Sequence, residues 1–94
     1  MIMCLCATLK PGKNAADVRR KREAWITSGK EEQLRRLCVS ATRYVIKGAK
    51  PPEVFWLLDT LDRRAAQLIK NHFGPLWDID ICDVEPQTIS ATVR

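Results

Sequence analysis

Alternating apolar and polar positions predict four strands along this chain. Residues 2–10 alternate and are rich in apolar side chains, and residues 77–84 (WDIDICDV) alternate cleanly. Residues 38–47 (CVSATRYVIK) contain the β-branched and aromatic side chains that strands favour. Residues 53–59 (EVFWLLD) form a nearly continuous apolar run, which is typical of a central strand covered on both faces.

A first helical segment lies between the first two strands. Asn14 is a suitable N-cap, and Ser28-Gly29 interrupts the segment. Ser28 and Glu31 have the spacing of a capping box, which would restart the helix through Leu37. The buried stripe of the first part is expected to contain Ala15, Val18, Arg22, Trp25 and Ile26.

A second helical segment precedes the last strand. Thr60 is placed to cap it, and Gly74-Pro75 is a strong signal for its end. Its buried stripe is expected to contain Leu61, Ala65, Leu68, Ile69, His72 and Leu76.

The order strand, helix, strand, strand, helix, strand predicts an α+β fold of the ferredoxin-like βαββαβ type. We expect a four-stranded antiparallel sheet in the order 4-1-3-2, with two helices on one face. No repeat or linker divides residues 1–94, so one domain is expected. After Pro86 we expect a tail, residues 87–94, that is mobile or contacts a partner.

The parity of the first and last strands assigns their side chains to two faces. Met3, Leu5, Ala7 and Leu9 form a purely apolar set, as do Ile79 and Ile81, and these sets should lie under the helices. The other face of these two neighbouring strands would then carry Cys4, Cys6, Cys82 and Asp80.

Three segments, together with the element order, carry a resemblance over nearly the whole chain: residues 43–48 (RYVIKG), 52–57 (PEVFWL) and 72–79 (HFGPLWDI). The chain resembles an uncharacterised family of small ferredoxin-like proteins related to the dimeric α+β-barrel superfamily. The resemblance implies a dimer whose two sheets face each other and enclose a space. It implies no particular chemistry, because that superfamily contains monooxygenases, isomerases, haem proteins and ligand sensors.

The face that carries the cysteines is the best candidate for a pocket or dimer face. We expect its lining to be Cys4, Cys6, Cys82, Asp80, Tyr44 and Trp56, with Phe55 as the alternative to Trp56. The simplest interpretation is that small, reduced, apolar thiols line the interface. Within a strand, Cys4 and Cys6 should hold their sulfurs about 6–7 Å apart, too far for one tetrahedral ion. No metal or cofactor is therefore predicted. Redox or nucleophilic cysteine chemistry lacks an evident partner base.

Two residues are weak candidates for a catalytic base. His72, the single histidine, lies on the buried helical stripe, where a hydrogen-bonded core histidine is the simpler interpretation. Its functional interpretation is a general base or haem ligand at the barrel mouth. Asp80 is the other candidate, on the last strand.

Charge and hydropathy restrict the partners. Residues 1–50 carry 12 basic and 4 acidic side chains, and residues 51–94 carry 4 and 7. The basic run at residues 19–22 wraps around its helix, and the third strand lacks the glycine of an RNA-reading sheet, so the sequence disfavours nucleic acid. No stretch has the length of a membrane span or the pattern of a signal peptide, which predicts a cytoplasmic protein.

The functional expectation is a homodimer, or a larger symmetric oligomer, that serves assembly or binds a small apolar ligand without catalysing a reaction. One alternative is a small dimeric-barrel enzyme of the monooxygenase or isomerase kind acting on an apolar or aromatic substrate. A second alternative is a basic nucleic-acid binder.

Overall fold

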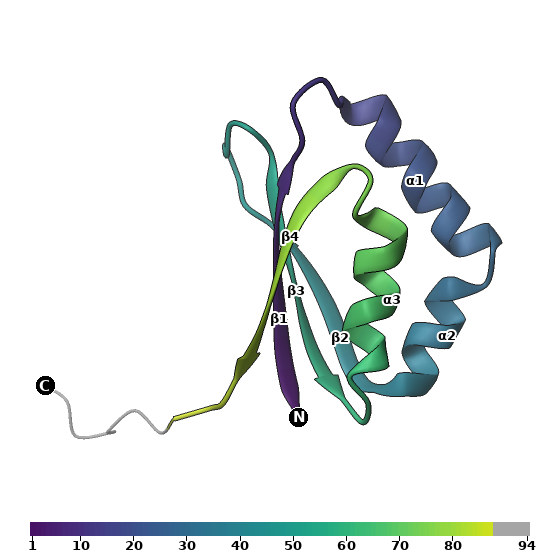
Figure 1. Ribbon diagram of the computed structural model, residues 1–94, viewed down its shortest axis with the longest axis vertical. Coiled ribbons are helices and arrows are strands. Elements are labelled where there is room, and N and C mark those ends of the chain that lie inside the picture. Colours follow the sequence, from purple (N-terminus) through teal and green to yellow (C-terminus); the bar gives the residue numbers. More distant parts are fainter. Residues whose placement is uncertain (88–94) are drawn as a thin grey trace, which may run out of the picture.

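Four antiparallel strands form one sheet in the computed structural model, which describes residues 1–87 (Figure 1). The strands are β1 (Ile2–Leu9), β2 (Cys38–Val45), β3 (Glu53–Thr60) and β4 (Trp77–Val84). Their order across the sheet is β2-β3-β1-β4, which is the predicted order counted from the opposite edge. The ferredoxin-like topology is therefore confirmed. All of the predicted tail except Gln87 lies outside the described residues.

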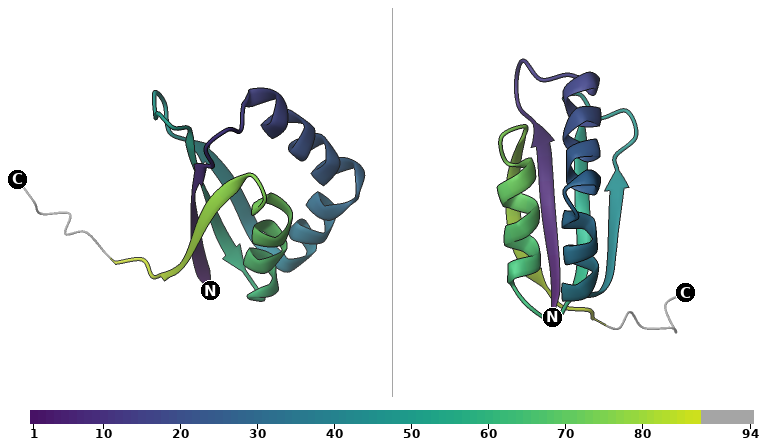
Figure 2. Two further views of the ribbon diagram at one scale, coloured as in Figure 1. Left: turned by 45° about the horizontal axis from the view of Figure 1, so that its top comes forward. Right: turned by 90° about the vertical axis from the view of Figure 1, so that its right-hand side faces the viewer.

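Three helices pack on one face of this sheet: α1 (Ala15–Thr27), α2 (Lys30–Leu37) and α3 (Arg64–Phe73). Figure 1 shows all three on the same side, and in the right-hand view of Figure 2 the α1–α2 pair lies over β3 and α3 over β4. The first helical segment is thus two helices, divided where Ser28-Gly29 was expected to interrupt it. Gly29 makes the break with a φ of +79°, a left-handed conformation that glycine adopts without steric cost. None of the helices formed by residues 1–87 is long and apolar enough to cross a membrane.

The N-terminal caps of α1 and α2 differ in kind. Asn14 caps α1 as predicted, because its side-chain oxygen accepts from the Asp17 backbone N–H and Asp17 accepts from the Asn14 N–H, each at 3.0 Å. The capping box predicted for Ser28 and Glu31 is wrong. The residue at the N-cap of α2 is Gly29, and the Ser28 hydroxyl instead donates to the Trp25 carbonyl oxygen at 3.3 Å.

Thr60 does not cap α3, contrary to the prediction. It is the last residue of β3 and is fully buried. Its hydroxyl lies 2.7 Å from the Asp62 carbonyl oxygen and 3.0 Å from that of Leu37, and it accepts the Asp62 backbone N–H at 3.1 Å. Helix α3 begins later, where the Asp62 carboxylate accepts the Arg64 backbone N–H at 2.8 Å. Leu61 therefore falls in the connection and is 73% exposed rather than part of the buried stripe.

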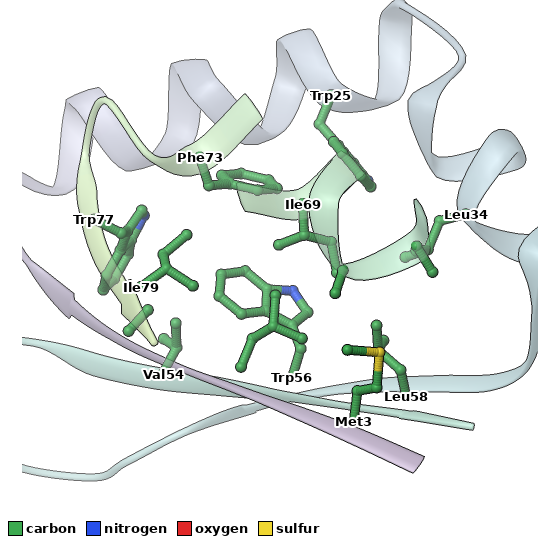
Figure 3. Packing of buried hydrophobic residues seen from close by; sticks show 14 of the residues in the cluster. Met3, Trp25, Leu34, Val54, Trp56, Leu58, Ile69, Phe73, Trp77 and Ile79 are labelled. Atoms are coloured by element: carbon green, nitrogen blue, oxygen red, sulfur yellow. The ribbon is translucent and has the colours of Figure 1, made fainter. Parts of the chain in front are cut away.

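Strand alternation builds the hydrophobic core between the sheet and the helices (Figure 3). The apolar set of β1 is buried there as predicted, and so is Ile79, while Ile81 is partly buried against it. Trp56 points from β3 into the middle of this cluster, with its ring centroid 5.5 Å from that of Phe73 on α3. Trp25 of α1 packs on Phe73 from the other side, at 5.1 Å between centroids.

The other surface of the sheet carries no helix among residues 1–87, and we call it the open face (Figure 1). The strand register gives its members: Ile2, Cys4, Cys6 and Thr8 on β1; Ser40, Thr42 and Tyr44 on β2; Glu53, Phe55, Leu57 and Asp59 on β3; and Asp78, Asp80, Cys82 and Val84 on β4. Within one chain β3 is thus covered on one face only, although its apolar run predicted cover on both. Leu57, for example, is 38% exposed.

Candidate functional site

The centre of the open face consists of two rows that run across all four strands. Antiparallel pairing aligns side chains directly opposite each other, so the members of a row are lateral neighbours. One row is Thr42, Leu57, Cys4 and Cys82, and the next is Tyr44, Phe55, Cys6 and Asp80. The structure therefore places five of the six side chains predicted for the pocket on one face, with Tyr44 at the β2 edge and Asp80 and Cys82 at the β4 edge.

Trp56 is the exception, and its assignment to this face is wrong. It pairs with Leu5 across the β1–β3 ladder, and both side chains lie beneath the helices, where Trp56 is 6% exposed. Phe55, the neighbouring residue with opposite parity, occupies the open face instead. Its ring stacks on that of Tyr44, with centroids 4.8 Å apart and an interplanar angle of 20°. This aromatic pair forms the bulky side of the face.

The three cysteines form the small side of the open face. Cys4 lies directly across from Cys82, and its sulfur is 3.7 Å from that of Cys6. The expected separation of about 6–7 Å between the sulfurs of Cys4 and Cys6 is therefore wrong, because it followed the backbone repeat of a strand. Side-chain torsions turn the two Sγ atoms toward each other, which makes a weak thiol–thiol hydrogen bond.

The protonation state of Cys4 follows from this packing. Burial, and then the hydrogen bond to Cys6, raise the pKa of Cys4 to about 11, so its thiol is neutral near pH 7. All four cysteines are free thiols. Within residues 1–87, no three histidine, cysteine or acidic side chains converge in a way that could hold a metal ion. The face offers small thiols next to aromatic and aliphatic side chains.

Asp80 and His72 occupy separate places, so the structure does not bring the two weak candidates for a base together. Asp80 is exposed on the open face, across from Cys6. His72 is on α3, in the helical layer, where its ring contacts Trp25 at 5.3 Å between centroids. A joint acid–base arrangement of the two residues is not formed.

Both ring nitrogens of His72 are engaged within the fold. Nε2 lies 2.8 Å from the Lys21 carbonyl oxygen and Nδ1 lies 3.0 Å from Lys30 Nζ. A carbonyl only accepts and an ammonium only donates, so Nε2 carries the hydrogen and Nδ1 accepts from Lys30. Burial, with the positive charges of Lys30 and Lys21 adding to it, lowers the pKa of His72. This geometry favours the core interpretation and leaves no free nitrogen for a base or a haem ligand.

Two side chains of the open face did not belong to the lining that the sequence analysis preferred. Leu57 lies in the same row as Cys4 and contributes the aliphatic centre of the face, and Phe55 was named only as the alternative to Trp56. The signal that could have found them is the parity of β3, in which Glu53, Phe55, Leu57 and Asp59 alternate with the buried side chains.

Several solved structures have the same architecture. A protein from Arabidopsis thaliana, known from an ensemble-refined crystal structure, is similar with a TM-score of 0.57 at 13% identity, covering 95% of this chain and 97% of its own. A dimeric ferredoxin-like protein from an uncultured marine organism has a TM-score of 0.54 at 12% identity, covering 93% of this chain and 96% of its own. The protein has the ferredoxin-like fold of these structures. A protein from Mycobacterium tuberculosis, with a TM-score of 0.51 at 14% identity, covers 94% of this ferredoxin-like chain and 98% of its own.

These likenesses establish the fold, and the fold resemblance expected from the sequence is confirmed at this level. No family model matches the chain, and no curated protein matches it. The function of this ferredoxin-like protein must therefore be argued from its own surfaces.

Proposed function

We propose that this protein is a homodimeric module in which two copies pack open face against open face. The observation that carries the proposal is the composition of the two central rows, which hold Tyr44, Phe55, Leu57 and the three cysteines on a surface without helical cover. Burying such side chains against a second copy removes apolar area from water, at about 25 cal/mol per Å². A domain of this length gains stability readily from self-association because its own core is small.

The arrangement of polar groups on the open face supports a second copy of the chain as the partner. The row beyond the aromatic pair contains Glu53, Thr8 and Asp78, and the row beyond Leu57 contains Ser40, Asp59, Ile2 and Val84. The apolar side chains of the face thus continue through Ile2 and Val84, with polar side chains beside them in both outer rows and at Asp80, and a polar rim is usual for a protein–protein interface. A two-fold axis through the centre would let both copies use the same patch, as most soluble dimers do. One of the similar structures is described as a dimeric ferredoxin-like protein, which agrees with this assembly.

The same face also supports the binding of a small apolar ligand between the two sheets. Stacked sheets pack about 10 Å apart, a gap that large side chains fill. Tyr44, Phe55 and Leu57 are large, whereas Cys4, Cys6 and Cys82 are small, so the β1–β4 side of the interface leaves room that the β2–β3 side does not. Small, polarizable thiols suit an apolar or aromatic occupant. The four free thiols also favour a reducing, cytoplasmic setting.

A matched pair of leucine variants tests the assembly. Leu57→Arg places a guanidinium at the centre of the open face, whereas Leu61→Arg places it at a leucine that is 73% exposed in the β3–α3 connection. Two desolvated like charges per dimer should weaken self-association by roughly 100-fold or more in Leu57→Arg. Sedimentation velocity should then show a dimer for the wild type and Leu61→Arg, and a monomer for Leu57→Arg. If the two variants had equal masses, the open face would not be the dimer interface.

A further inference from the structure

A cavity of about 220 Å³ lies on the opposite side of the sheet from the open face, between the α1–α2 pair and the β2 edge. Its walls come from both helices, from β2 and β3, and from the end of α3. The side chains that matter here are Arg22, Trp25, Glu31, Arg43, Trp56 and Phe73. None of the side chains assigned to the open face other than Thr42 belongs to this lining, so the cavity is a separate feature of the protomer.

The cavity carries uncompensated positive charge. Arg22 from α1 and Arg43 from β2 both line it, and neither forms an ion pair with any acidic side chain in residues 1–87. Glu31, the acid in the lining, is paired with Arg35, with 3.9 Å between Nη2 and Oε2. Two guanidinium groups that share a cavity repel each other, and that repulsion is relieved when an anion lies between them.

Arg43 is the more confined of the two arginines. Its side chain is half-buried, with the guanidinium carbon 5.9 Å from the centre of the Trp56 ring. Burial lowers the pKa of Arg43, and the nearby charge of Arg22 adds to that effect. A partly desolvated guanidinium with unused donors presents a planar fork that matches a carboxylate.

Next to these charges the cavity has an aromatic wall. Trp56 and Phe73 have ring centroids 5.5 Å apart, and Phe73 and Trp25 have centroids 5.1 Å apart (Figure 3). The three side chains are only 5–6% exposed, so the parts of them that reach the cavity form a small apolar wall at its inner end. The volume is below the about 300–1,000 Å³ that is usual for pockets of drug-sized molecules, which restricts an occupant to roughly one ring.

We propose that this cavity binds a small aromatic carboxylate, with its ring against Trp25, Trp56 and Phe73 and its carboxylate between Arg22 and Arg43. The charge pair selects an anion, and the aromatic wall selects a flat apolar group attached to it. The site lies within one protomer, so it goes beyond the proposed assembly and does not rest on it.

Binding of benzoate and phenylacetate to the full chain tests this site, with uncharged benzamide and inorganic phosphate as comparison probes. Isothermal titration should give saturable binding of at least one carboxylate at one site per protomer. Benzamide, which lacks the charge, and phosphate, which lacks the ring, should each bind at least about 10-fold more weakly, a loss typical of one charge-assisted contact. Absence of binding by both carboxylates up to 10 mM, or equal affinity for benzamide or phosphate, would overturn the proposal.

Arginine variants test which side chains bind the carboxylate. Arg43→Gln and Arg22→Gln should each weaken carboxylate binding about 10-fold or more, because each removes a charge-assisted hydrogen-bond donor. Arg19→Gln, an exposed position on α1 outside the cavity lining, is the matched control and should bind as the wild type does. If Arg43→Gln does not fold, the exposed Arg22→Gln still decides the result. Unchanged affinity in Arg22→Gln would contradict the site. The sedimentation mass of the same samples reports the dimer separately, so failure of one proposal is distinguishable from failure of the other.

Discussion

Tyr44 and Phe55 stack face to face across the β2–β3 ladder, with ring centroids 4.8 Å apart, on the surface of the sheet that the helices leave uncovered. Tyr44 remains 44% exposed in this arrangement. A stacked aromatic pair exposed on a sheet is a strong anchor when a second surface covers it, because aromatic side chains dominate interface energetics.

Removal of this stack should weaken the dimer more than it weakens the fold. We expect Tyr44→Ala to raise the dimer dissociation constant by about 30-fold or more, since an aromatic anchor typically contributes at least about 2 kcal/mol. Tyr44→Phe keeps the ring and should change the constant by less than about 5-fold. Sedimentation equilibrium of the three proteins measures the difference. Identical constants for Tyr44→Ala and wild type would show that this part of the face is outside the interface.

Trp56 should behave in the opposite way from its neighbour Phe55. Trp56 is buried beside Phe73, so Trp56→Ala should lower the free energy of unfolding by about 3–5 kcal/mol through the cavity it leaves. Phe55→Ala should chiefly weaken association, because Phe55 faces away from that core. Urea denaturation, performed at a concentration where the chains are monomeric, separates the two effects. Equal destabilisation of the monomer by both substitutions would contradict the assignment of the two faces.

The stability of the protein should decrease as the pH falls below the ordinary pKa of histidine. Burial and the neighbouring lysines hold the pKa of His72 below 6.5, so the unfolded chain takes up the proton first. The contribution of neutral His72 is therefore complete above about pH 6.5 and is lost as the pH falls from there through the lower folded pKa.

Each unit by which the fold lowers that pKa corresponds to about 1.4 kcal/mol. Urea midpoints at pH 7.5 and 5.5 measure the loss in the wild type. His72→Gln retains a hydrogen-bonding side chain that does not titrate, so its midpoint should change less between the two pH values. A loss of stability that is the same in both proteins would assign the effect to other groups.

The alkylation rates of the open-face thiols should depend both on their local environment and on dimer formation. At a concentration where the wild-type chains are monomeric, the exposed Cys6 and Cys82 should react with iodoacetamide before Cys4 does. The pKa of Cys4 is raised to about 11. At pH 8 such a thiol is only about 0.1% thiolate, and the thiolate is the reactive form.

In the wild-type dimer, Cys6 and Cys82 should both be alkylated at least about 10-fold more slowly, because a partner sheet covers them. Peptide mapping by mass spectrometry assigns each modified residue. Leu61→Arg is the control and should keep the slow, wild-type pattern. Fast labelling of Cys6 and Cys82 in the wild type would mean that the face is accessible in solution.

The two faces of β1 could be predicted from the sequence because clean alternation fixes parity, and the strand order could be predicted because the order of the elements is that of the ferredoxin-like fold. The parity of β3 was also present in the sequence, because Glu53 and Asp59 share a face with Phe55 and Leu57, but the apolar run between the two acids obscured it. Trp56 belongs to the purely apolar set, and its pairing with Leu5 places its ring under the helices. The choice of Trp56 rather than Phe55 for the open face was wrong for this reason.

Other features of the structure could not be predicted from the sequence because they depend on side-chain torsions and long-range contacts. The 3.7 Å approach of the Cys4 and Cys6 sulfurs depends on rotamers that residue spacing does not specify. Thr60 has the residue type of a cap, but its hydroxyl contacts Leu37, 23 residues earlier, which no local pattern indicates. The expected buried stripe of α1 is wrong at Arg22, which is exposed, and the place of Arg22 beside Arg43 in one cavity depends on tertiary structure that the helical pattern does not specify.

The molar mass of the wild-type protein in solution tests the central claim most directly. Sedimentation equilibrium over a range of micromolar concentrations should give twice the mass of one chain, or a larger even multiple, with dissociation appearing only on dilution. A mass equal to one chain at every concentration would contradict it, because the open face would then remain in contact with water.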